Sequence, residues 1–386
     1  MTSSTAKRAL RGLVRAALAV PLALPLAAQA DYAAELGKLK SAKPNDATLV
    51  TLQAGLAAFS ENKMPEATRH FDLALDVIEG MFADTESAAK ARSLWYAEGA
   101  KDFKGEPYER AMAFYYRGLA YLADADYENA RASFRSGLLQ DAFAEEQQFR
   151  ADFTSLMLLE GWANQLAGDQ AQAQDAYAEV ARAKSGWQAP PANANLLVVA
   201  ELGGSPRKVA DGIDNHEIRY FKPKRTPERQ LRVQLDGQAV QPVLVEDVFY
   251  QASTRGGRAI DSIIAGKASF KQTTADIGMA ATNVANELKV YAPAVGSSGR
   301  ALGGLVAVGA IASMISANVQ PRADVRYWNN LPETIHIAAL NHGGLPGNVQ
   351  VSLLDEAGNP VAADKLVINK WIDAKGNMLV WIKSRN

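Results

Sequence analysis

A pattern of small and aromatic residues occurs three times in the first half of the chain. In each copy a glycine is followed twelve positions later by an alanine, and four positions after that by an aromatic residue. The copies are Gly55, Ala67 and Phe71, then Gly118, Ala130 and Phe134, then Gly161, Ala173 and Tyr177. A further small residue follows three positions later in the first two copies, as Ala74 and Gly137, whereas the third copy has Val180 there. Because small residues let two helices approach closely and aromatic side chains fill the space between units, the pattern predicts stacked pairs of helices.

This pattern is typical of tetratricopeptide repeats, which are two-helix units joined by a short turn. The three glycines lie further apart than the roughly 34 residues of a regular array. That spacing predicts an extra helix over about residues 85–98 and a lengthened connection over about residues 141–152. Stacked units of this kind form a solenoid with an extended concave surface that binds peptides and proteins.

Three adjacent residues on the first helix of the second unit are candidate partner-binding residues. Tyr115, Tyr116 and Arg117 are of the types that line such concave surfaces. Since adjacent positions on a helix face different ways, one of the two tyrosines is expected to pack against a neighbouring helix instead.

The first thirty residues predict export. A basic leader is followed by an uncharged stretch, residues 16–27, and by Ala28-Gln29-Ala30, which has the small-x-small pattern of a cleavage site. We expect cleavage after Ala30, with an uncleaved anchor as the alternative. The chain has no cysteine, which excludes disulfides, thiolate nucleophiles and cysteine-ligated metals, and also the lipid attachment of a lipoprotein.

A different pattern follows Pro190 and Pro191, which end the last helix. Short apolar or alternating runs bounded by turn residues predict strands. The predicted strands are residues 196–202, 217–222, 231–235, 243–250, 334–340, 348–353, 366–371 and 378–383. The last four, with tight turns between them, predict a small antiparallel sheet or sandwich.

Two apolar helices are predicted between these groups of strands, at residues 259–291 and 301–319. The second is 19 residues without a charge, which is the length of a membrane span. Its glycines and polar residues favour a helix buried within the protein, and insertion into a membrane or a partner is the alternative.

Two further motifs resemble those of a family of uncharacterised bacterial envelope proteins with tetratricopeptide repeats. The first motif is Gly105, Glu106, Pro107 and Tyr108, and the second is Asp324, Arg326, Trp328, Leu331 and Pro332 in the spacing Asp-x-Arg-x-Trp-x-x-Leu-Pro. The resemblance implies an envelope protein, often a lipoprotein, with no established activity. It also implies association with outer-membrane factors that assist cell-wall synthesis. The missing cysteine departs from the family and puts stable outer-membrane attachment in doubt.

The two motifs also have a physical interpretation. Glu106 and Glu109 lie near a helix start, where negative charge is favoured by the helix dipole. Asp324, Arg326 and Trp328 share one side of an extended segment. A structural clamp is the favoured interpretation, and a ligand site is the alternative.

No recognisable catalytic chemistry appears in the sequence. The four histidines lack the spacing of a metal motif. Nucleophile-elbow and phosphate-loop motifs are also missing. We therefore expect no cofactor, no metal site and no enzyme activity. Acidic residues exceed basic ones before residue 188, and basic residues are in slight excess after it, which gives little support to nucleic-acid binding.

Together these features predict an α+β multidomain protein. The expected division is a signal peptide (1–30), a tetratricopeptide-like helical repeat solenoid (31–187), a linker (188–194) and a C-terminal mixed domain with antiparallel sheet and apolar helices (195–386). The expected function is that of a periplasmic or envelope scaffold that binds an envelope protein through its repeats. The alternatives are a membrane-associated assembly component that uses residues 301–319, and an enzyme whose site arises only in three dimensions.

Overall fold

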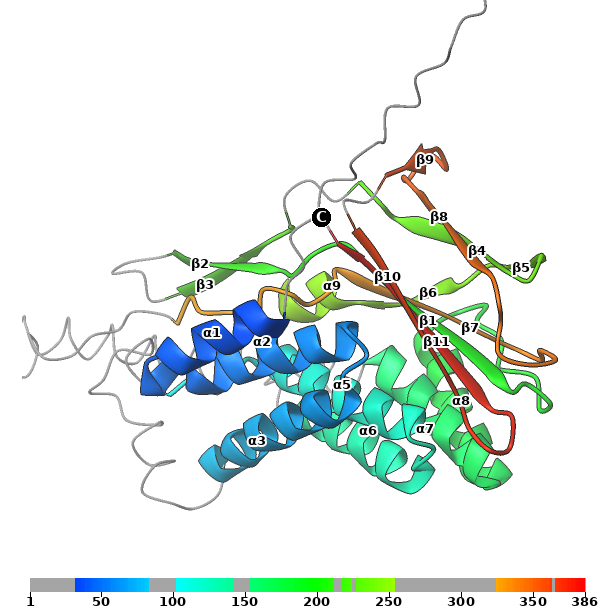
Figure 1. Ribbon diagram of the computed structural model, residues 1–386, viewed down its shortest axis with the longest axis horizontal. Helices are drawn as coiled ribbons and strands as arrows, with labels where there is room; N and C mark the ends of the chain where they lie inside the picture. Colours follow the sequence, from blue (N-terminus) through cyan, green and yellow to red (C-terminus); the bar gives the residue numbers. More distant parts are fainter. Residues whose placement is uncertain are drawn as a thin grey trace, which may run out of the picture.

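Helices fill the first half of the chain and strands dominate the second (Figure 1). The computed structural model describes residues 32–82, 102–141, 153–211, 217–223, 227–253, 324–362 and 365–385. The expected signal peptide, the extra helix, nearly all of the lengthened connection and both apolar helices lie outside these residues. Among the helices that are described, none is long and apolar enough to cross a membrane.

The helices form three hairpins after a short N-terminal helix. Their bounds are α1 (Tyr32–Ser41), η1 (Pro44–Asp46), α2 (Ala47–Ser60), α3 (Met64–Phe82), α5 (Pro107–Ala123), α6 (Tyr127–Asp141), α7 (Thr154–Ala167) and α8 (Gln170–Ala183). Each hairpin turn contains one residue with positive φ, namely Asn62, Ala125 or Gly168. The chain can therefore reverse within a few residues and bring the two helices of each hairpin together.

Each hairpin is held by a close contact between the glycine and the aromatic residue of the repeat pattern. A Cβ atom added to Gly118 would lie 2.3 Å from the ring of Phe134. The corresponding distances are 2.9 Å for Gly55 and Phe71, and 2.5 Å for Gly161 and Tyr177. Because no side chain fits in these gaps, only glycine allows the ring to pack directly against the backbone of the first helix.

The two helices of each hairpin differ in burial. The first helices, α2, α5 and α7, are buried at nearly every position. The second helices expose one side, on which Leu73 of α3 is 53% exposed and Leu139 of α6 is 62% exposed. The first helices are buried on both sides because they lie between the second helices and a β-sheet (Figure 1).

That sheet has five strands in the order β10-β11-β1-β7-β6. The strands are β1 (Leu196–Leu202), β6 (Val243–Asp247), β7 (Thr334–Leu340), β10 (Lys365–Ile372) and β11 (Met378–Arg385). β1 pairs with β11 in parallel, whereas the other neighbours are antiparallel. The sheet is therefore mixed, and the predicted antiparallel pairing holds for every neighbouring pair in it except β1 and β11. The sequence pattern of the four C-terminal strands did not indicate that β1 lies between two of them, β11 and β7.

The alternation of side chains along β1 places two cores on opposite faces of the sheet. Leu197 and Val199 face the helices, and their cluster also contains Phe59 of α2 and Trp381 of β11. Leu196, Val198, Ala200 and Leu202 belong to a second cluster on the other face. A four-stranded antiparallel sheet covers that face, with β5 (Gln238–Val240), β4 (Gln230–Leu235), β8 (Val349–Leu354) and β9 (Pro360–Val361) in this order.

A separate hairpin of β2 (Arg207–Asp211) and β3 (Glu217–Phe221) lies beside the helices. The described residues thus form three layers of helices, sheet and sheet, and the α+β class is confirmed. Most predicted strands agree with the structure to within one or two residues, but residues 248–250 belong to a short helix, α9 (Val248–Ser253).

Candidate functional site

The inner surface of the helical hairpins is covered by the chain's own sheet. Tyr115 and Tyr116 of α5 are fully buried, and their hydroxyl groups donate hydrogen bonds to the two carboxylate oxygens of Glu201, at 3.1 and 2.7 Å. The prediction that these tyrosines bind a partner is therefore wrong. The third predicted residue, Arg117, is 7% exposed and donates to Asp72 of α3 at 2.5 Å.

Glu201 is the centre of this closed interface. Besides the two tyrosines, Nε1 of Trp381 and Nζ of Lys383 donate to its carboxylate at 2.8 and 2.7 Å. Its exposure is zero. The carboxylate thus has four hydrogen-bond donors, one of which is an ammonium group, so its oxygens are satisfied without water. Burial and the charge of Glu201 raise the pKa of Tyr115 well above its usual range, so this hydroxyl remains a donor.

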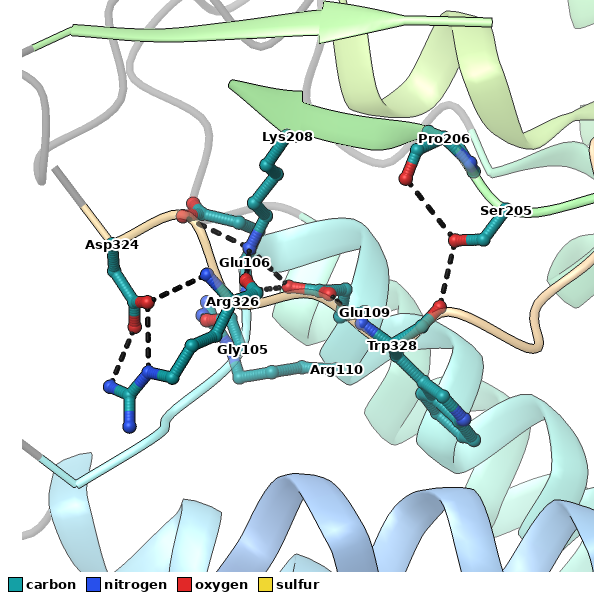
Figure 2. Close-up of polar contacts among 10 residues, drawn as sticks. All are labelled: Gly105, Glu106, Glu109, Arg110, Ser205, Pro206, Lys208, Asp324, Arg326 and Trp328. Atoms are coloured by element: carbon teal, nitrogen blue, oxygen red, sulfur yellow. Dashed lines mark hydrogen bonds and ion pairs between the residues drawn. The ribbon is translucent and has the colours of Figure 1, made fainter. Parts of the chain in front are cut away.

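The two family-like motifs meet in a second buried cluster (Figure 2). Glu106 and Glu109 form a capping box at the start of α5, in which the backbone N–H of Glu106 donates to Glu109 at 2.8 Å. The carboxylate of Glu109 also accepts from Nζ of Lys208 at 2.7 Å and from the backbone N–H of Trp328 at 2.8 Å. One buried carboxylate thus connects α5, β2 and the segment that precedes β7.

The rest of the second motif extends this connection. Arg326 binds Asp324 through two hydrogen bonds of 2.9 and 2.8 Å, and its third nitrogen donates to Asp46 at 2.9 Å. The carbonyl of Trp328 accepts from the hydroxyl of Ser205 at 2.7 Å. Leu331 and Pro332, the last two residues of the motif, are also buried.

The remaining motif residues are structural as well. Gly105 has a φ of 70°, and its carbonyl accepts from Arg110 at 2.9 Å. Pro107 is the first residue of α5, and Tyr108 is fully buried. With 0% of the Glu109 side chain and 1% of the Lys208 side chain exposed, a ligand cannot reach the ion pair at the centre of the cluster. The geometry supports a structural clamp.

The histidines of the described residues do not come together in one site. His70 bonds to Tyr32 and His336 bonds to Thr334, and the two histidines lie on different elements. Burial, and secondarily the charge of Lys184, lower the pKa of His336 to about 4, so this ring is neutral at pH 7. Within the described ranges, no group of three or more His, Asp or Glu residues could hold a metal ion.

Two features of the five-stranded sheet remain accessible, and the first is its β10 edge. β10 is eight residues long and pairs with β11 without a bulge. Its residues are partly exposed throughout, and no described strand lies on its outer side. In an antiparallel pair every second residue directs its N–H and C=O groups away from the partner strand. β10 therefore presents a row of backbone groups that another strand can bind.

The second feature is a groove at the opposite edge, next to β6. It has a volume of about 810 Å³ and lies between the segment that follows α8 and the ends of β6 and β7. The groove lining consists of Leu158, residues 184–191, Gln241, Val243, Leu244 and residues 337–339. This volume is in the range of small-molecule pockets.

Sequence reasoning did not identify Glu201, Lys208 or either open feature. A signal for Glu201 was present, because a single charge inside the buried run Leu196–Leu202 requires a polar partner. Comparisons with protein-family models, curated proteins and solved structures found no match to this chain. The resemblance to the envelope family therefore stays a prediction.

Proposed function

We propose that the protein is an exported envelope scaffold whose helical hairpins are tetratricopeptide-like repeats, and that it binds a partner protein by strand addition to β10. The repeat assignment is supported by the three glycine–aromatic contacts and by the packing of α3 on α5 and of α6 on α7. In this proposal the repeats hold the chain's own sheet, and the partner binds at the periphery of that sheet.

The uncovered β10 edge carries the proposal. Strand addition gives affinity through main-chain hydrogen bonds and specificity through alternate side chains. The apolar residues Leu366, Val367 and Ile368 of β10 are partly exposed and also pack against the cores on the two faces of the sheet. Natural edges are usually protected by being short, bulged or covered, or by carrying lysine, and among the described residues β10 has only the last of these protections, in Lys365 and Lys370.

The charge of β10 favours an acidic partner segment. The strand carries Lys365 and Lys370 and no acidic residue. Nζ of Lys370 donates to the carbonyls of Pro346 and Gly347, at 2.6 and 3.4 Å, and its charge acts on the carboxylate of Asp236 without forming a direct ion pair with it. An extended segment with alternating apolar and acidic residues would complement this edge.

A capture experiment with matched charge reversals tests the proposal. The purified protein is used as bait for envelope extract, alongside Lys370→Glu on β10 and Lys375→Glu in the exposed turn between β10 and β11. We expect one specific envelope protein to be retained by the wild type and by Lys375→Glu, and at least tenfold less of it by Lys370→Glu.

Two results would count against the proposal. Equal retention by all three baits would place the partner away from β10. Failure of the wild-type protein to retain any specific protein would contradict the scaffold function itself.

A further inference from the structure

The groove beside β6 combines an apolar wall with one cationic group. Leu244 and Val243 are 44% and 49% exposed, although they belong to a strand of the central sheet. Trp187 and Pro190 also line the groove and are partly exposed, whereas Leu158 of α7 lines it as a buried residue. Covering such side chains removes apolar area from water, which favours a ligand with an apolar body.

Lys184 is the only ionisable side chain among the described residues that line the groove. Its Nζ donates to the carbonyl of Leu244 at 3.1 Å, and no described carboxylate lies within ion-pair distance of it. An ammonium group has three donors, so two N–H groups remain for a ligand. His336, which lies near Lys184, is neutral at pH 7 and adds no second charge.

We propose that this groove binds a single-chain amphiphile with a carboxylate head group. The chain lies against Trp187, Pro190 and Leu244, and the carboxylate accepts hydrogen bonds from Nζ of Lys184. One ammonium group balances one negative charge, whereas a dianionic head group would bring an uncompensated charge to an apolar wall. This site is separate from β10, which lies at the other edge of the sheet, so it does not depend on the proposed partner.

Calorimetric titration with two surfactants of equal chain length and opposite charge tests the proposal. Decanoate and decyltrimethylammonium are added to the purified protein below their micelle concentrations. Decanoate is expected to bind at least tenfold more tightly. Lys184→Met should weaken decanoate binding at least tenfold. Lys184→Arg should bind decanoate within about threefold of the wild-type affinity, because the positive charge is kept.

Arg182→Met is the matched control, because it removes a positive charge two residues away and outside the groove. It should leave the affinity for decanoate unchanged. Equal binding of the two surfactants, or equal effects of Lys184→Met and Arg182→Met, would overturn the proposal. A photoreactive decanoate analogue provides a second measurement. We expect the analogue to label residues 184–191 and 241–244. Labelling confined to other regions would also overturn the proposal.

Discussion

The helix-facing side of the central sheet and its β10 edge differ in how their polar groups are satisfied. On the helix-facing side, Glu201 and Glu109 are completely buried, and each accepts hydrogen bonds from several parts of the chain. At the edge, the outward-facing backbone groups of β10 have no described strand beside them. The comparison teaches that buried charges in this protein organise its fold, whereas the groups left accessible for recognition lie at the periphery of the sheet.

Removal of the Glu201 carboxylate should have the largest effect on the closed side. Glu201→Leu leaves Lys383 buried without its ion-pair partner, and such changes cost about 3–5 kcal/mol. Urea denaturation should therefore show a large loss in the free energy of unfolding. The double variant Glu201→Leu/Lys383→Met should recover part of this loss, because no charge is then left unpaired. A loss below about 1 kcal/mol in the single variant would contradict the role assigned to Glu201.

Acid should also weaken the fold, through His336, which pairs with Ala200 of β1 and lies on the face of the sheet away from the helices. Burial lowers its pKa from 6.5 to about 4. Between these values the unfolded chain binds a proton that the folded protein does not, so stability falls as the pH falls from 6.5 to 4. The full difference corresponds to about 3 kcal/mol. Urea titrations across this range should show the decline for the wild type and a smaller decline for His336→Gln, and equal slopes would argue against the assignment.

A smaller effect is expected where the first helix of a hairpin meets the second. Gly118→Ala places a methyl group against the ring of Phe134, and overpacking of this kind costs about 1–3 kcal/mol. Gly37 of α1 is the matched control, because no atom lies within 4 Å of a Cβ added there. Gly37→Ala should stabilise the helix by about 0.5–1 kcal/mol. Thermal unfolding of the two variants distinguishes these opposite signs.

The smallest effect on stability is expected at the edge. Lys370→Glu removes hydrogen bonds to two carbonyls of a loop, and its free energy of unfolding should stay within about 1 kcal/mol of the wild type. The same variant is expected to lose partner binding. A large destabilisation would mean that β10 is part of the closed structure rather than an open edge.

The sequence predicted features that depend on local spacing. The contacts of Gly118 with Phe134 and of Gly161 with Tyr177 follow from a repeat pattern within about twenty residues, and the strand at residues 196–202 follows from a short apolar run. The position of β1 between β11 and β7 could not be predicted, because it depends on pairing between residues far apart in the chain.

The error at Tyr115 and Tyr116 has the same origin. Tyrosines on the first helix of a hairpin are typical of the concave, partner-binding surface of a repeat solenoid. In this protein the corresponding surface is covered by a sheet from the other half of the chain. The two motifs at residues 105–108 and 324–332 were predicted to be clamps, and only the structure revealed that Glu109 joins them.

Hydrogen exchange of the complex between this protein and the captured partner tests the central claim most directly. If the partner adds a strand to β10, the backbone amides of alternate residues between Lys365 and Ile372 should exchange at least tenfold more slowly in the complex, while those of α2 and α5 should not change. Unchanged exchange in β10, together with protection of the outer helices α3 or α6, would contradict strand addition and place the partner on the hairpins.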